Sequence, residues 1–343
     1  MAERVLTLRE LNRALLARQL LLERRKLGVL AAIERVAGLQ AQWPPSPYIG
    51  LWSRLAGFRR ETLERAVRRG DVLKPTVMRG TLHLVTARDY PLYYAALRDM
   101  PTWFQPHHLE HARRLLAEVR ARAPLTQSDV VAYIRSFGHE EIDARRIMHA
   151  VRRHAHLLHN AESALWTTTP RVVYHPYPEP DEQDGAAARA ELVRRYLRAF
   201  GPATKADIAD WSGLAVRDFA HALDGLPTFR TDDGRELFDV PRAPLPAADT
   251  AVPVRFLPKW DNTLLGHADR RRVITDELRR GVIAKNGDVA ATVLVDGFVA
   301  ATWTYDRAGT VSVTYVAPVS RTQKLAVAQE AARLQEWLKC PAQ

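Results

Sequence analysis

Two carboxamide side chains one residue apart, Gln40 and Gln42, have the spacing in this chain that points most directly to chemistry. They follow an apolar-periodic stretch that predicts a helix, and they precede a break led by Pro44 and Pro45. A carboxamide accepts a hydrogen bond through oxygen and donates one through nitrogen, but it is no general base at neutral pH. Such a pair suits a reaction whose leaving group departs readily and which needs only a water molecule held in place.

The residue between the glutamines, Ala41, is small and apolar. If residues 39–42 are extended, the one-residue gap directs both carboxamides to the same face of the strand. We then expect the two amides to hold one water molecule from different sides. The alternative interpretation is a chance pair of glutamines, one of which caps the carbonyls at the end of the preceding helix.

Charge indicates the kind of partner. The chain of 343 residues carries 50 Lys and Arg against 39 Asp and Glu, a net charge of +11, and most of the cations are arginine. An excess of this size favours a polyanion, and the planar fork of arginine suits phosphate. A codon bias that enriches arginine and alanine is the alternative explanation. The length predicts two or three domains.

The only cysteine is Cys340, so no disulfide can form within the chain, which is typical of a reducing compartment. We see no signal peptide, and no stretch approaches the roughly 18 apolar residues of a membrane span. We therefore expect a cytoplasmic protein without membrane contacts. His107 and His111 have the spacing of a zinc pair on a helix, but no third ligand is evident, so we expect neither a metal nor another cofactor.

A helix-start signature occurs three times. In each case a hydroxyl residue stands three positions before an acid, the pattern of a capping box. The three hydroxyl residues are Thr7, Thr126 and Thr204. After the third, a short helix, a turn at Gly213, a second helix over 215–223 and two strands around 228–230 and 236–240 are expected. This order of elements is that of a winged helix.

Two further units of this kind are expected earlier in the chain. One has wing strands over 72–78 and 81–86, and the other has helices over 127–137 and 143–154 and a hairpin over 157–168. Helices are also expected over 87–100 and 181–200. A proline-rich linker over 241–253 leads to strands over 289–295, 298–305 and 311–316 and a closing helix over 320–338.

Several segments, taken together, resemble one known family. Residues 35–42, 48–55, 78–85, 256–270 and 295–303 resemble the AlkZ-type winged-helix DNA glycosylases, in the right order over nearly the whole chain. The resemblance implies three tandem winged-helix units around a concave DNA-binding face. It also implies excision of N7-alkylated purines, including the unhooking of interstrand crosslinks. Gln40 and Gln42 fall on the first and third positions of the Gln-aliphatic-Gln signature, so both are expected to be catalytic.

The fold class expected from these patterns is α+β, mostly α: three winged-helix units plus a small C-terminal antiparallel sheet and helix. The expected segments are 1–105, 106–200, 201–245 and 246–343. Outside the glutamine pair, DNA contacts are expected at the first wing and in the loop over 259–270. Those residues are Arg79, Thr81, His83, Lys259, Trp260, Asp261, Asn262, His267 and Arg270.

The leading hypothesis is a monomeric, monofunctional DNA glycosylase that hydrolyses the N-glycosidic bond of alkylated or crosslinked purines in double-stranded DNA. A non-catalytic winged-helix transcriptional regulator is the alternative, because winged helices occur in both classes and a fold alone does not decide function. A nucleotide hydrolase is disfavoured because the chain has no phosphate-binding loop. The identity of the adduct, and the choice between general repair and self-resistance, stay open.

Overall fold

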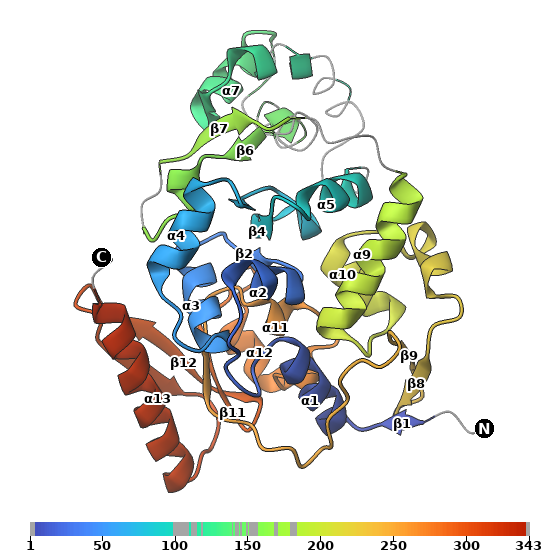
Figure 1. Cartoon of the computed structure of the whole chain (residues 1–343), viewed down its shortest axis with the longest axis vertical. Helices are drawn as coiled ribbons and strands as arrows, with labels where there is room; N and C mark the ends of the chain where they lie inside the picture. Colours follow the sequence, from blue (N-terminus) through green and yellow to red (C-terminus); the bar gives the residue numbers. More distant parts are fainter. Residues whose placement is uncertain are drawn as a thin grey trace.

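The computed structural model describes residues 4–98, 119–138, 157–167, 171–178 and 184–340, together with 110, 115–117, 140, 144, 146–148 and 150. Within these residues the chain is a mixture of helices and four small sheets (Figure 1). No helix in this part of the chain is long and apolar enough to cross a lipid bilayer.

The first sheet positions the glutamine pair. It has the order β2-β4-β3, and both strand pairs are antiparallel. Its strands are β2 (Leu39–Gln40), β3 (Val72–Leu73) and β4 (His83–Thr86), and the nearby helices are α2 (Val29–Arg35), α3 (Pro45–Arg54) and α4 (Arg60–Arg68). Leu39, Leu84 and Ile33 are buried in the same core cluster, so α2 covers one face of this sheet. The strand expected over 72–78 is shorter than predicted, since β3 ends at Leu73, and η1 (Met78–Gly80) lies between it and β4.

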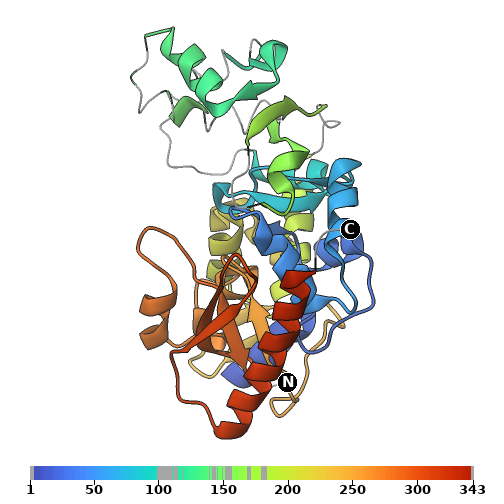
Figure 2. The same ribbon diagram turned by 90° about the vertical axis from the view of Figure 1, so that its left-hand side faces the viewer.

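The second sheet lies at one end of the molecule, where Figure 2 shows it projecting from the body. Its strands have the order β5-β7-β6. They are β5 (Leu125–Thr126), β6 (Leu157–His159) and β7 (Val173–Pro176), accompanied by α7 (Gln127–Arg135) and η2 (Ala161–Ala164). The hairpin expected over 157–168 is longer, because η2 lies between its two strands. The helix expected over 143–154 falls largely outside the described residues.

The third sheet joins the start of the chain to a later segment, in the order β1-β8-β9. The elements are β1 (Val5–Leu6), β8 (Thr228–Thr231), β9 (Glu236–Phe238), α1 (Leu8–Arg18), α5 (Tyr90–Leu97), α9 (Gly185–Phe200) and α10 (Lys205–Ser212). The prediction of an α-helix over 215–223 is wrong. Two 3₁₀ turns, η3 (Val216–Asp218) and η4 (Ala220–Leu223), take its place.

The last sheet is antiparallel, with the order β10-β11-β12-β13. It contains β10 (Arg255–Leu257), β11 (Thr292–Val295), β12 (Phe298–Tyr305) and β13 (Val311–Tyr315), and α13 (Arg321–Lys339) packs along it. Between β10 and β11 lie α11 (Asn262–Leu265), η5 (Arg270–Arg272) and α12 (Asp276–Val282). The C-terminal sheet and closing helix are confirmed, and β10 is an additional strand that the sequence did not reveal.

The three expected capping boxes are confirmed at Thr7, Thr126 and Thr204, each with a hydroxyl-to-backbone bond and a returning carboxylate. The mixed α and β character is confirmed as well. The division into three winged-helix units and the four segments stays a prediction. Within that division, β1 pairs with β8, so the start of the chain contributes to the sheet of the third segment.

Candidate functional site

Gln40 lies on β2 directly opposite His83 of β4. Opposed residues in an antiparallel ladder point to the same face, whereas their neighbours Leu39 and Leu84 point to the other. Since Leu39 and Leu84 belong to the core against α2, Gln40 and His83 occupy the face away from α2. Both are buried, with exposed fractions of 6% for Gln40 and 0% for His83.

Gln42 lies beyond the end of β2, at a bend before α3, and is exposed. The Nε2 group of Gln40 donates a hydrogen bond of 2.7 Å to Oε1 of Gln42. The two carboxamides therefore lie together, as the spacing predicted, but they are not equivalent. One is buried and bonded to the other, and the other reaches the surface.

Arg79 fixes the orientation of this pair. Its Nη2 donates to Oε1 of Gln40 at 3.0 Å and to Oδ1 of Asn262 at 3.2 Å, and its Nη1 donates to the carbonyl of Trp211 at 3.1 Å. A guanidinium has donors only, so the oxygen of Gln40 must face Arg79 and its nitrogen must face Gln42. The backbone of Arg79 has a φ of 55°, a left-handed conformation that is rare for a non-glycine residue.

Asn262, the first residue of α11, closes the network. Its Oδ1 accepts from Arg79, and its Nδ2 donates to the carbonyl of Gly38 at 3.4 Å. Asn262 therefore links Gly38, the residue before β2, to the guanidinium of Arg79. Asn262 is buried, which removes it from solvent competition for these bonds.

The two titratable side chains described beside Gln40, His83 and Arg79, are both poor proton donors at neutral pH. Burial, together with the charge of Arg79, lowers the pKa of His83 to about 3. The imidazole is therefore neutral, and its Nδ1–H donates to the carbonyl of Thr81 at 3.1 Å. Its Nε2 is buried and has no hydrogen-bond partner among the described groups. Burial also lowers the pKa of Arg79 to about 10, against the opposing charge of Asp210, so the guanidinium keeps its proton.

Two residues of the expected DNA-binding loop have their polar atoms occupied inside the protein. Asp261 accepts two hydrogen bonds from Arg54, at 2.8 and 2.9 Å, and caps α11 through the backbone N–H of Thr263. Burial opposes ionisation of Asp261, but Arg54 holds its pKa below the usual value. His267 is also buried, and its Nε2 lies 3.0 Å from the carbonyl of Phe200. Direct DNA contact by either residue stays a prediction that this packing does not favour.

The remaining expected contacts lie nearer the surface. Lys259 is 2.9 Å from a carboxylate oxygen of Asp288, and its ammonium group lies 4.6 Å from the ring centroid of Trp260. Trp260 is half-buried, and its Nε1 donates to the carbonyl of Gly287 at 2.9 Å. Arg270 lies 3.7 Å from Asp210. Their contacts with DNA stay predictions.

The remaining wing residue, Thr81, follows η1 and is half-buried. Its Oγ1 donates a hydrogen bond to the carbonyl of Met78 at 2.9 Å, which closes the turn that carries Arg79. Contact of Thr81 with DNA also stays a prediction.

The sequence did not single out three groups that shape the site. Gly38 and Trp211 act through backbone carbonyls, which side-chain patterns do not report, and Asp210 acts through its charge on Arg79. The expected histidine pair His107 and His111 lies outside the described residues. Within the described part of the chain, no group of three or more His, Cys, Asp or Glu residues could hold a metal ion.

Comparison with known proteins assigns this chain to a family. A family model described as DNA glycosylase AlkZ-like matches residues 33–337. The chain therefore belongs to the AlkZ-like DNA glycosylase family, and it is an enzyme of DNA repair that acts on DNA. This assignment replaces the alternative of a non-catalytic regulator.

A curated relative and a solved structure, both from Streptomyces sahachiroi, are similar to this chain. One is named interstrand DNA cross-link repair glycosylase and is 25% identical over 318 residues, which cover 83% of this chain and 84% of that protein. The solved structure of the DNA glycosylase AlkZ matches with a TM-score of 0.81 at 22% identity, covering 97% of each chain. That structural likeness supports the fold.

Proposed function

We propose that this glycosylase hydrolyses the bond between C1′ and N9 of N7-alkylated purines in duplex DNA, including purines joined in interstrand crosslinks. The observation that carries the proposal is the chemistry of the groups bonded to Gln40. They are a protonated guanidinium and a second carboxamide, beside a neutral imidazole. None of these groups donates a proton readily at neutral pH, so the departing base must already be activated.

An N7-alkylated purine meets that requirement because its ring carries a positive charge. When the C1′–N9 bond breaks, its electron pair passes into the ring and cancels that charge, so no acid is needed at the base. The sugar becomes electron-deficient at C1′ and accepts a water oxygen there. The proton released by that water passes to bulk solvent, since a carboxamide cannot hold it.

Gln42 is the residue we assign to the water. It is exposed, and its Oε1 already accepts from Gln40, so a second lone pair stays available for a water O–H. Gln40 stands behind it and is held by Arg79. The unpartnered Nε2 of His83 lies on the same face but is buried, so we assign it no contact with the sugar. Orientation of this kind lowers a barrier by up to about 7–11 kcal/mol when the geometry is near attack.

The name of the similar Streptomyces sahachiroi protein concerns crosslink repair, and it supports including crosslinked purines among the substrates. The test uses the purified protein and a duplex that carries a single N7-methylguanine, with an unmodified duplex as the control. We expect release of free 7-methylguanine and an abasic site that breaks only after treatment with alkali. Release of a neutral damaged base such as uracil, without release of 7-methylguanine, would contradict the proposal.

A further inference from the structure

A cationic cleft lies on the far side of the first sheet from Gln40. It has a volume of about 630 Å³ and is bordered by α2, the start of α5, α9 and the segment 240–244. Since α2 covers the face of the sheet opposite Gln40, this cleft is separate from the glutamine site. It is lined by two carboxylates, Glu34 and Asp89, and by six arginines: Arg35, Arg88, Arg194, Arg195, Arg198 and Arg242.

Internal partners account for half of these arginines. Arg195 forms an ion pair with Asp89, and Glu191 is shared by Arg194 at 3.8 Å and Arg198 at 2.9 Å. Of the two lining carboxylates, Glu34 instead accepts a hydrogen bond from the hydroxyl of Thr86 at 3.2 Å.

The other three arginines, Arg35, Arg88 and Arg242, are exposed and form no ion pair with any residue in the described part of the chain. They come from separate segments, namely the end of α2, the turn after β4 and the segment 240–244. Gathering like charges around a hollow is unfavourable unless an anion neutralises them. Arg242 is moreover held at a φ of 59°, a left-handed conformation that costs a non-glycine residue about 1 kcal/mol or more.

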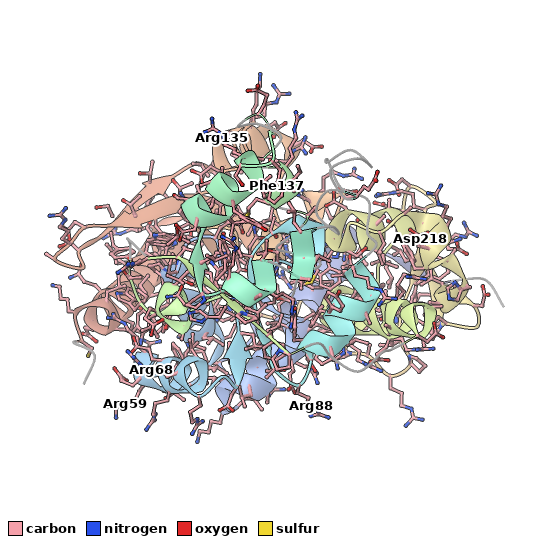
Figure 3. All side chains as sticks on the ribbon, turned by 90° about the horizontal axis from the view of Figure 1, so that it is seen from above. Arg59, Arg68, Arg88, Arg135, Phe137 and Asp218 are labelled. Carbon is pink, nitrogen blue, oxygen red and sulfur yellow. The ribbon has the colours of Figure 1, made fainter. Side chains whose placement is uncertain are left out.

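Further arginines lie toward the same edge in one view of the molecule. In the view of Figure 3, Arg59, Arg68 and Arg88 are labelled near one edge of the molecule. The planar guanidinium group suits contact with the phosphates of a nucleic acid backbone.

We propose that this cleft binds the phosphate backbone of a second segment of duplex DNA, apart from the segment that reaches Gln42. A long duplex can loop or wrap to place two of its segments on the two sides of the protein, whereas a short duplex reaches one side only. The proposal concerns undamaged DNA and does not depend on which lesion is excised.

The test compares two triple variants of the full chain that each remove three positive charges. The cleft variant carries Arg35→Ala, Arg88→Ala and Arg242→Ala. The control variant carries Arg217→Ala, Arg307→Ala and Arg321→Ala, which are also exposed. Binding to an undamaged duplex of one helical turn and to one of many turns is measured over a range of salt concentrations. Excision from the short damaged duplex reports whether each variant is folded.

We expect the cleft variant to bind the long duplex about tenfold more weakly at low salt. The slope of the logarithm of its affinity against the logarithm of salt concentration should become shallower by about 0.9 for each lost phosphate contact. Its affinity for the short duplex and its excision rate on the short damaged duplex should be unchanged. The control variant should lose much less affinity for the long duplex. Equal losses in both variants would mean a general effect of net charge and would overturn the proposal. The proposal would also be overturned if the cleft variant kept its affinity for the long duplex, or if it lost affinity for the short and long duplexes equally.

Discussion

Nη2 of Arg79 donates a hydrogen bond of 3.0 Å to Oε1 of Gln40. This contact fixes the orientation of the buried carboxamide of Gln40. Through the hydrogen bond between Gln40 and Gln42, it also fixes the orientation of the exposed carboxamide. The sequence suggested a DNA contact for Arg79. The hydrogen bonds of its guanidinium to Gln40, Asn262 and the carbonyl of Trp211 support a positioning role instead.

If Arg79 is a positioning residue, its substitution should change the rate of excision and leave DNA affinity alone. We expect Arg79→Met to lower the single-turnover rate on N7-methylguanine DNA on the order of 10²-fold, the usual cost of losing one oriented donor. The dissociation constant for the same DNA should stay within about twofold. Arg79→Lys keeps a donor and should recover part of the rate. A parallel loss of affinity would identify Arg79 as a DNA contact.

The ion pair between Arg54 and Asp261 should support the fold of the site. Both side chains are buried, with exposed fractions of 1% and 3%, so removing one leaves the other charge without a partner. We expect Asp261→Ala to lower the free energy of unfolding by about 3–5 kcal/mol in urea denaturation. The matched control is Asp288→Ala, which breaks the half-exposed pair with Lys259 and should cost about 1 kcal/mol or less. Equal losses would contradict the role of burial.

His83 should make the fold sensitive to acid. Burial lowers its pKa to about 3 in the folded protein, whereas an unfolded histidine titrates near 6.5. The unfolded chain therefore binds the extra proton first, so the stabilisation is complete above about pH 6.5 and is lost as the pH falls toward 3. We expect His83→Leu to reduce the slope of unfolding free energy against pH by up to about 1.4 kcal/mol per pH unit in this window. His221→Gln, at an exposed position, should leave the slope unchanged.

Local chemistry explains what the sequence predicted well. A capping box involves residues three positions apart, so Thr7, Thr126 and Thr204 could be read directly from the chain. The turn at Asp296 and Gly297 is equally local, and it correctly placed the hairpin of β11 and β12. The proximity of Gln40 and Gln42 follows from the same short range.

Long-range contacts explain what the sequence did not reveal. Strand β10 exists because it pairs with β11, which lies far along the chain. The partner of Asp261 is Arg54, 207 residues away, so a polar residue in an apolar frame was interpreted as a ligand contact. The different exposure of Gln40 and Gln42 arises because β2 ends between them, which no periodicity indicated.

The most direct measurement of the central claim is the single-turnover rate of Gln42→Ala on a duplex with one N7-methylguanine. The control is Gln329→Ala, which removes an exposed carboxamide from α13. If the exposed amide of Gln42 holds the attacking water, the rate should fall on the order of 10²-fold with little change in DNA affinity, and the control should match the unaltered enzyme. A Gln42→Ala rate within about twofold of the unaltered enzyme would contradict the assignment.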